Sequence, residues 1–400
     1  MNTHLDGVAG WNTDPTEIGR QIAYLGVRLE RDWPSAKTAD GLAFHRVQQA
    51  GNPLLRLWLS VLEGSPATQR ASLDYCRRIY GRYGAGLLYA VGGPNEEDDP
   101  YPQRQGARLP DSARVQQLLY DWAHPLGLKV NQMEFGAGWT AANQWQGDYH
   151  PAHPGINDTV PANGDQQYRP GPADFGGSHP YLVNRTTTPA ALLARLRRLA
   201  LLATPGKPVA HTEIGGYARS GLSPAVFGRY LVMGAFDSAA AGDAGYLVYG
   251  LQDGAVEGSY GFFTADGREN PVATYFHTLT TLLQCSNPSL RYAPGEAATF
   301  VPGGLDVSFA NTTSVSHFIL QKPTGEYVIA VYSEQLMNGS EKEAMDTVHF
   351  GKTFPRAEVY DVEKGTTPIT TQSNASSCTL TLLPSDTYLI VLSWKPAAVR

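Results

Sequence analysis

Short apolar runs alternate with amphipathic helices over residues 1–287 of this 400-residue chain. The strand-like runs are Asn2–Leu5, Gly26–Leu29, Leu54–Leu62, Gly86–Val91, Lys129–Phe135, Ala173–Ser178, Pro208–Glu213 and Gly245–Leu251. Strands that alternate with helices indicate βαβ units and a parallel sheet. Eight such units predict an α/β fold of the (β/α)8 TIM-barrel class. A doubly wound open sheet is the alternative, which is disfavoured because no GxGxxG or phosphate-loop motif follows the first run.

The predicted helices are Pro15–Leu25, Thr38–Ala50, Ala67–Tyr83, Ser112–His124, Pro189–Leu202, Pro224–Ala239 and Pro271–Leu283. Four of them begin with a capping residue and a proline, at Asp14-Pro15, Thr188-Pro189, Ser223-Pro224 and Asn270-Pro271. The capping side chain accepts a hydrogen bond from an unpaired backbone N–H, and proline has no N–H to leave unpaired. These dipeptides therefore predict where four helices begin.

The pattern changes to short β-rich runs after Cys285. The runs are Leu305–Phe309, His317–Gln321, Tyr327–Tyr332, Ala357–Val362, Cys378–Leu383 and Thr387–Leu392, separated by turns that contain glycine and proline. Helical periodicity is absent, so we predict an antiparallel β-sandwich. The predicted domains are a catalytic barrel over residues 1–287 and an accessory sandwich over residues 288–400.

Charge and cysteine content exclude several classes of protein. The net charge is −6 with no Lys/Arg-rich run, which argues against a nucleic-acid partner. No apolar stretch reaches the roughly 20 residues of a membrane span. The three cysteines form no metal-binding pattern, so we expect no metal and no cofactor, and a Cys285–Cys378 pairing stays open.

Few charges and many aromatic, glycine and proline residues are typical of a loop-rich extracytoplasmic enzyme. Charged residues make up 17% and aromatic residues 10% of the chain, with 42 Gly and 28 Pro. We therefore expect a secreted or periplasmic monomer whose export signal is not part of this sequence.

Two glutamates follow apolar runs and are the strongest candidates for chemistry. Glu96 ends Tyr-Ala-Val-Gly-Gly-Pro-Asn-Glu, and Glu213 lies in Pro-Val-Ala-His-Thr-Glu-Ile-Gly-Gly. Barrel enzymes carry catalytic groups just past the carboxyl ends of their strands. Two carboxylates on different strands match the acid/base and nucleophile that cleavage of a glycosidic bond requires.

Each glutamate also has a structural interpretation. Glu96 is followed by Glu97 and two aspartates, a sequence that would also suit a solvated acidic loop. Glu213 could form an ion pair with Arg28 or Arg219. The two motifs occurring three β/α units apart favour the catalytic interpretation.

Several motifs together resemble clan A of the retaining glycoside hydrolases, in particular bacterial proteins similar to families 39 and 5. The matching segments are Gly93-Pro94-Asn95-Glu96, Ser178-His179-Pro180-Tyr181, His211-Thr212-Glu213, Tyr249-Gly250-Leu251-Gln252-Asp253, Tyr260-Gly261-Phe262-Phe263 and Asp266-Gly267-Arg268-Glu269-Asn270-Pro271. With the sandwich, the resemblance covers nearly the whole chain.

The resemblance implies a role for each matching residue. Glu96 would be the acid/base, Glu213 the nucleophile, Asn95 a ligand of the sugar 2-position, Tyr181 a partner of the nucleophile, His179 part of the floor, and Arg28 the arginine that orients the nucleophile. Arg31, three residues further on, is the alternative to Arg28.

The sequence departs from the family pattern at two positions. Glu97 replaces the common proline after Asn-Glu, so the choice between Glu96 and Glu97 stays open. Gln252 stands on the eighth strand where a tryptophan or an acid is common. Aromatic residues that could stack on sugar rings include Trp33, Trp139, Trp145, Tyr149 and Tyr249, of which we select Trp139, Trp145 and Tyr249, together with Gln252, as substrate-binding candidates.

The resemblance therefore implies a retaining β-glycoside hydrolase that acts on an oligo- or polysaccharide. A non-catalytic carbohydrate-binding protein on a degenerate barrel and a transglycosylase are the alternatives.

Overall fold

The computed structural model describes residues 1–5, 13–62, 64–96, 109–132, 172–182, 187–216, 222–254, 261–284, 305–322, 324–335 and 342–394. The chain forms two compact units. The first comprises Met1–Tyr181, Leu192–Tyr217 and Gly242–Gly261. The second comprises Leu182–Ala191, Ala218–Ala241 and Phe262–Arg400.

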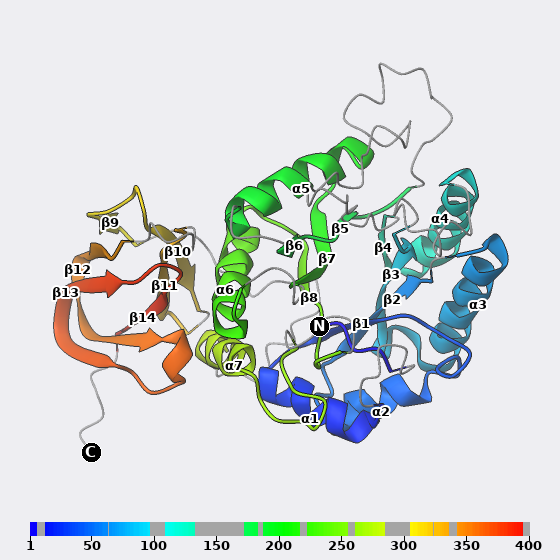
Figure 1. Ribbon diagram of the computed structural model, residues 1–400, viewed down its shortest axis with the longest axis horizontal. Helices are drawn as coiled ribbons and strands as arrows, with labels where there is room; N and C mark the ends of the chain where they lie inside the picture. Colours follow the sequence, from blue (N-terminus) through cyan, green and yellow to red (C-terminus); the bar gives the residue numbers. More distant parts are fainter. Residues whose placement is uncertain are drawn as a thin grey trace. The chain divides into compact units, whose positions relative to one another are not determined.

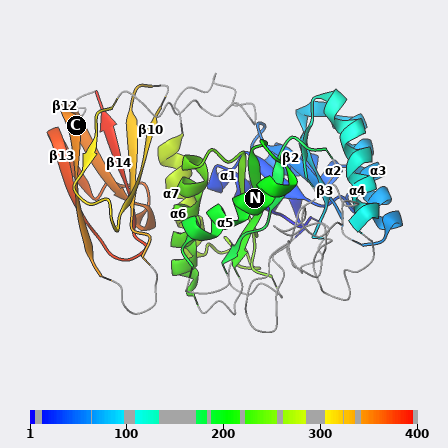
Figure 2. The same cartoon turned by 90° about the horizontal axis from the view of Figure 1, so that it is seen from above.

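The first unit is built on parallel strands. Strands β1 (Leu29–Asp32), β2 (Arg56–Val61), β3 (Leu88–Pro94) and β4 (Lys129–Asn131) form one sheet in that order. Helices α1 (Pro15–Leu25), α2 (Leu42–Ala50), α3 (Pro66–Tyr83) and α4 (Leu109–Ala123) lie outside these strands (Figures 1 and 2). Sequence and structure thus agree on a mixed α/β fold with parallel strands.

A second sheet holds the other strands of this unit among the described residues. It contains β5 (Gly176–Ser178), β6 (Tyr181–Leu182), β7 (Val209–Gly216) and β8 (Gly245–Val248), with β7 running parallel to β5 and β8. Helix α5 (Pro189–Ala203) leads into β7. Each of these strands except β6 falls on or beside a run predicted from sequence.

The two sheets are linked at two places by isolated backbone pairs. Asn131 at the end of β4 pairs in parallel with Phe175, which precedes β5. Asn2 pairs in parallel with Arg31 of β1, and its N–H donates to the Val248 carbonyl at 2.9 Å. The predicted first strand is therefore represented by Asn2, which lies between β8 and β1.

Strand β1 begins three residues later than predicted. Gly26 adopts a left-handed conformation (φ 66°) and caps α1, its N–H directed to the carbonyls of Ala23 and Ile22. A left-handed cap after α1 occupies the residues assigned to the strand, because glycine tolerates this conformation better than any other residue. This shift brings Arg31 into the strand.

The proline-based helix starts agree with the structure. The side chains of Asp14 and Ser223 accept hydrogen bonds from Thr16 N and Val226 N, and Ser65-Pro66 begins α3 in the same way. Asn270 precedes α7 without a side-chain capping bond. Pro at the first turn therefore predicted the start of α7 even where the cap itself is not made.

The second unit combines two helices with an antiparallel sheet. Its helices are α6 (Pro224–Ala240) and α7 (Pro271–Leu283). The sheet has the order β10 (Ser316–Gln321), β11 (Tyr327–Tyr332), β14 (Thr387–Ser393), β12 (Ala344–Asp361), β13 (Thr370–Leu382), and β9 (Ser308–Phe309) also pairs with β12 (Figure 1). Its core includes Ile329, Val331, Phe350, Phe354, Val359, Leu382, Ile390 and Leu392.

Strands β12 and β13 are much longer than the runs predicted from sequence. The missed half of β13 reads Thr-Thr-Gln-Ser-Asn-Ala-Ser-Ser, and most of these residues are exposed or half-buried. A strand with a polar, solvent-facing surface lacks the apolar run used to find it, although threonine suits a strand well.

No helix in the described part of the chain is long and apolar enough to cross a membrane. Cys76 and Cys378 carry free, buried thiols, and burial raises the pKa of Cys76 to about 12 and that of Cys378 to about 11. Cys285 lies outside the described residues, and the Cys285–Cys378 pairing that the sequence left open is not made, because the Cys378 thiol is free.

Candidate active site

Glu213 lies near the end of β7 and is held through both carboxylate oxygens. Arg31 Nη1 donates to Oε1 at 2.7 Å, and the Tyr181 hydroxyl donates to Oε2. The carboxylate is only 4% exposed, so it depends on these two donors in place of water. A carboxylate held by two donors has a fixed orientation.

Arg31 is fully buried and donates to four residues from distant parts of the first unit. Besides Glu213, its guanidinium donates to Ser60 Oγ at 3.0 Å, Asn2 Oδ1 at 2.7 Å and Asn95 Oδ1 at 2.9 Å. A buried cation is tolerated when its N–H groups are paired in this way, and guanidinium suits the task because it offers a rigid fork of donors.

The arginine that contacts Glu213 is therefore Arg31, whereas the sequence interpretation selected Arg28. The reason is the later start of β1, which places Arg28 in the connection after α1. In that connection the carbonyl of Arg28 accepts a hydrogen bond from Arg56 N at 2.9 Å.

Glu96 follows directly on β3 and turns its side chain toward His179. Its backbone is left-handed (φ 46°), which is uncommon for a residue other than glycine. Its Oε1 lies 2.8 Å from His179 Nδ1. Non-glycine residues in such conformations persist where surrounding contacts fix them, as the histidine does for this carboxylate.

His179 lies between the two glutamates. Its Nδ1 is 2.8 Å from Glu96 Oε1 and 3.6 Å from Glu213 Oε2, and its Nε2 is 3.1 Å from Thr212 Oγ1. Burial of the ring disfavours the imidazolium, but Glu213 and Glu96 outweigh this effect and raise the pKa of His179 above its ordinary value. The site thus contains a histidine whose charge is stabilised by both candidate carboxylates.

One side-chain oxygen or nitrogen from each of Glu96, His179 and Glu213 lies within 4.8 Å of the other two. Such a trio could in principle ligate a metal ion. Glu213, however, is already bonded to the cationic Arg31, and a divalent cation would have to share that carboxylate with a fixed positive charge. The donors fit a carboxylate pair with an intervening histidine better than they fit a metal site.

A chain of polar contacts fixes β5, the strand that directly precedes His179. Ser178 Oγ lies 2.8 Å from His211 Nδ1, and His211 Nε2 lies 3.0 Å from Asp243 Oδ2. Arg197 of α5 donates through Nε to Asp243 Oδ1 at 2.7 Å. Ser178 is 1% exposed, so this serine–histidine–aspartate chain joins β5 to β7 and is closed to substrate.

Tyr181 reaches Glu213 because the facing residue of β7 is a glycine. A Cβ atom on Gly215 would lie 2.7 Å from Tyr181 Cε1 and 2.8 Å from the Tyr249 carbonyl oxygen. The ring centroids of Tyr181 and Tyr249 are 6.1 Å apart in an edge-to-face arrangement. Glycine at position 215 thus allows the Tyr181 ring and the Tyr249 backbone to pack against β7.

The other predicted substrate-binding residues are placed as follows. Asn95 points its amide oxygen at Arg31, which orients the amide group. Gln252 is buried, and its Nε2 donates to Gln21 of α1 at 2.9 Å, an internal contact that the sequence pattern did not indicate. Trp139 and Trp145 lie outside the described residues, as do Glu97 and Tyr149.

Sequence reasoning missed two residues of the site, Asn2 and His4. Asn2 accepts from Arg31 and donates through Nδ2 to the carbonyls of Thr212 and Val248, both at 3.1 Å. His4 Nε2 lies 2.8 Å from the Tyr249 hydroxyl. Residues two apart on a strand share a face, so two polar side chains at positions 2 and 4 of a predicted strand were an available signal.

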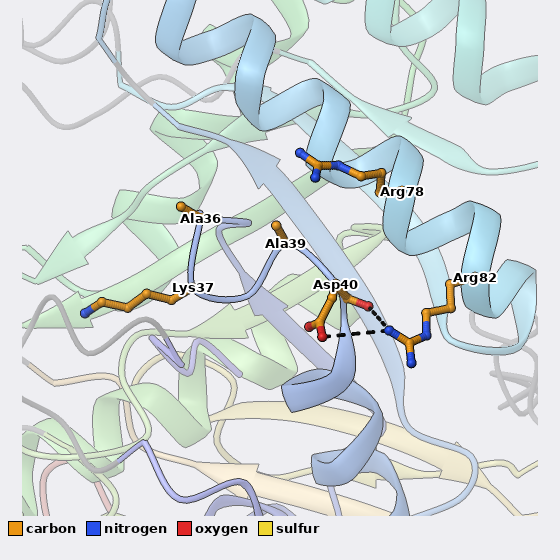
Figure 3. Close-up of a pocket in the computed structure, with 6 residues that line it drawn as sticks. All are labelled: Ala36, Lys37, Ala39, Asp40, Arg78 and Arg82. Carbon is orange, nitrogen blue, oxygen red and sulfur yellow. Dashed lines mark hydrogen bonds and ion pairs between the residues drawn. The ribbon is translucent and has the colours of Figure 1, made fainter.

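A separate hollow lies between the segment after β1 and helix α3. It encloses about 530 Å³ and is lined by Ala36, Lys37, Ala39, Asp40, Arg78 and Arg82 (Figure 3). Figure 3 shows Asp40 turned toward Arg82, which lies 3.7 Å away. Both side chains are more than half exposed, and we assign no ligand to this hollow.

Removing the imidazole of His179 tests the electrostatics of the site. We expect His179→Gln to unfold at a lower temperature than the wild type at pH 6, and the difference to shrink as the pH rises through the folded-state pKa of His179. A raised histidine pKa contributes stability that is fully present below about pH 6.5, the ordinary value, and is lost as the pH rises through the folded-state pKa.

Thermal unfolding of both proteins at half-unit pH steps measures this difference. A difference that stays constant over the whole pH range in which both proteins are folded would show that the imidazole contributes only packing and neutral hydrogen bonds.

Comparisons with known proteins identify the fold. No protein-family model matches the sequence, and no curated protein matches it. Among solved structures, the chain is similar to a glucosidase from Croceicoccus marinus, with 10% identity, 94% of this chain and 91% of that chain covered, and a TM-score of 0.61. It is also similar to a GH30 endoxylanase from Clostridium papyrosolvens C71, with 14% identity, 95% and 92% coverage, and a TM-score of 0.56. The chain therefore has a fold found in glycoside hydrolases.

Proposed function

We propose that this protein is a retaining β-glycoside hydrolase in which Glu213 is the nucleophile and Glu96 the acid/base. The observation that carries the proposal is the spacing of the two carboxylates, of which one oxygen from each lies within 4.8 Å of the other. Retaining enzymes hold their carboxyl groups about 5–5.5 Å apart, whereas inverting enzymes need about 6.5–9.5 Å to admit a water. The short spacing favours direct attack by one carboxylate.

The proposal includes a closed (β/α)8 barrel and a C-terminal sandwich. Closure is supported by the backbone pairs of Asn2 with β8 and β1 and of Asn131 with Phe175. The two carboxylates then lie at the carboxyl ends of β3 and β7, where barrel enzymes carry their catalytic groups. We further propose a monomeric, extracytoplasmic enzyme with an oligo- or polysaccharide substrate.

In the first step, a Glu213 oxygen attacks the anomeric carbon and forms a covalent glycosyl-enzyme. The bond from that carbon to the leaving oxygen breaks, and Glu96 supplies the proton that the leaving group needs. Arg31 and Tyr181 hold the attacking carboxylate in one orientation, which lowers the entropic part of the barrier.

In the second step, Glu96 removes a proton from an incoming water, and the water oxygen displaces Glu213 from the anomeric carbon. The proton returned to Glu96 restores the starting state. His179, which is bonded to Glu96 and lies close to Glu213, faces both carboxylates as their protonation and charge change through the cycle. Asn95, with its oxygen held by Arg31, is oriented to donate through its amide nitrogen to a sugar hydroxyl.

Screening the full chain on bacterial and plant polysaccharides and on β-glycosides tests the proposal. Proton NMR of the first product should show the β-anomer, and a 2-deoxy-2-fluoroglycosyl fluoride should label Glu213, as located by peptide mass analysis. An α-anomer as first product would overturn the retaining mechanism. Sugar binding without turnover would indicate the carbohydrate-binding alternative, and transfer to an added acceptor in place of water would indicate a transglycosylase.

A further inference from the structure

Three rings cluster on the side of the site where Arg31 meets Glu213. The rings of His4 and Trp33 stack with centroids 4.5 Å apart, and Tyr249 lies edge-on to both, at 5.3 Å from His4 and 6.5 Å from Trp33. The Arg31 guanidinium carbon lies 4.6 Å from the centroid of Trp33. This guanidinium also donates to Glu213. The Arg31 side chain therefore contacts both the ring cluster and the candidate nucleophile.

Trp33 carries a buried donor without a partner. The side chain is 6% exposed, and its Nε1–H has no hydrogen-bond partner among the described residues. Leaving such a group unpaired costs free energy, and one explanation for an unpaired group in a native structure is a missing ligand. Trp58 of β2 also has an unpaired Nε1, but its ring stacks on Phe175 within an apolar cluster.

Hydrogen bonds to Asp32 fix the positions of His4 and Trp33. Its Oδ1 accepts from Trp33 N at 2.6 Å, and its Oδ2 accepts from Leu5 N and Thr3 Oγ1, both at 2.8 Å. The carboxylate thereby holds the Thr3 hydroxyl and the Leu5 N–H on the two sides of His4, and the N–H of Trp33. Groups held this firmly provide the preorganisation that binding a sugar ring requires.

None of the three rings contributes a charge. Burial, and to a lesser extent Arg31, lowers the pKa of His4 to about 3, so its imidazole is neutral near pH 7. Arg31 itself is bonded to Glu213. The cluster therefore offers aromatic surfaces and a neutral donor, a set suited to the C–H faces and hydroxyl groups of an uncharged sugar.

We infer that His4, Trp33 and Tyr249 form a recess that binds the uncharged sugar ring whose anomeric carbon reacts, with Trp33 Nε1–H donating to one of its hydroxyl groups. The inference rests on the proposed function and adds to it the class of the reacting sugar and two binding residues, His4 and Trp33. In the recess, Trp33 contacts the substrate. Asp32 is a positioning residue that holds Trp33 in place.

The test uses p-nitrophenyl β-glycosides of glucose, galactose, mannose, xylose and glucuronic acid with the full chain. We expect turnover of at least one neutral glycoside and little of the glucuronide.

On the best substrate, Trp33→Phe, which keeps a ring and loses the donor, should lower kcat/KM about 2- to 12-fold, the effect of one neutral hydrogen bond. Against the monodeoxy analogues of that sugar, one analogue should react equally well with both proteins, because it lacks the hydroxyl that Trp33 would bind.

Trp58→Phe is the matched control, since it removes an unpaired indole N–H away from the recess and should leave kcat/KM within about twofold of the wild type. Tyr249→Phe, which loses the bond to His4, provides a second variant if Trp33→Phe does not fold, and it should raise KM with a smaller effect on kcat.

The outcomes separate the two proposals. Labelled Glu213 with equal kinetics for Trp33→Phe and Trp58→Phe, or with unchanged kinetics for Tyr249→Phe, would overturn the recess alone. Turnover of the glucuronide only would overturn the sugar class. A wild type that neither hydrolyses nor is labelled would overturn the proposed function itself.

Discussion

Glu213→Ala is expected to lower hydrolysis by more than about 10³-fold, because the proposed mechanism has no other nucleophile for its first step. The alanine also leaves a space beside Arg31 and Tyr181, the two donors that hold the carboxylate. A small anion such as azide can enter that space and attack the anomeric carbon. We expect added azide to restore part of the activity on an activated β-glycoside and to yield the α-glycosyl azide.

Glu96→Gln gives the complementary result if the roles are assigned correctly. Loss of the acid/base should reduce hydrolysis by about 10²–10⁴-fold, and least for substrates with good leaving groups, which need no proton. Azide then attacks the accumulated glycosyl-enzyme and should yield the β-glycosyl azide. Glu97→Gln is the matched control. If Glu97→Gln loses more hydrolytic activity than Glu96→Gln, Glu97 is the acid/base.

The kinetics of these variants are informative only if the proteins fold alike. Glu17 is a glutamate on the surface of α1 in the same compact unit, and Glu17→Gln provides a control for the loss of one carboxylate. Near-full activity of Glu213→Ala, with the Glu17→Gln protein equally active, would contradict the assignment of the nucleophile.

Sequence reasoning located the parts of the fold that are determined by residues close together in the chain. The bounds of α1 and α7 agree with the prediction because proline marks each first turn and the apolar periodicity ends sharply. The strand β1 was misplaced by three residues, although Gly26 is a common signal of a helix C-cap. That one boundary decided whether Arg28 or Arg31 would face Glu213.

The site was less predictable than the strands because its contacts join distant parts of the chain. Asn2 and Arg31 meet only once the N-terminal segment pairs with β1. The barrel prediction makes these two segments neighbours, but no local pattern indicates which residues pair. Gln252 ends beside Gln21, 231 positions away in sequence. Motif matching selected Glu96, His179 and Glu213 as candidates. The distances between them depend on the tertiary structure and could not be predicted from a single sequence.

A chain that ends near residue 290 is expected to be insoluble. Helices α6 and α7 belong to the same compact unit as the antiparallel sheet. Phe236 of α6 stacks on Tyr332 of β11 with ring centroids 5.7 Å apart, and the Tyr332 hydroxyl donates to Asp237 at 2.8 Å. Removing the sheet would expose Phe236, whose burial is worth about 1.5–3 kcal/mol, together with its apolar neighbours.

The truncation would also leave a cation on α6 without its partners. Arg229 donates through Nη2 to Glu363 Oε2 at 3.0 Å and forms an ion pair with Glu363 through Nε. It also lies 3.7 Å from Asp386, and the Tyr275 hydroxyl of α7 donates to Glu363 at 3.3 Å. The guanidinium is only about one-fifth exposed, so loss of these carboxylates leaves it poorly solvated as well as unpaired.

Two point variants test the contribution of Tyr332 to stability in the full-length protein. Tyr332→Ala removes the ring and its hydroxyl and should lower the free energy of unfolding by about 3–5 kcal/mol, whereas Tyr332→Phe loses only the bond to Asp237 and should cost about 1 kcal/mol. Chemical denaturation monitored by tryptophan fluorescence measures both. A truncated chain that stays soluble and hydrolyses the same substrates would mean that the antiparallel sheet is a separable module, and Tyr332→Ala would then be expected to leave catalysis at its wild-type rate.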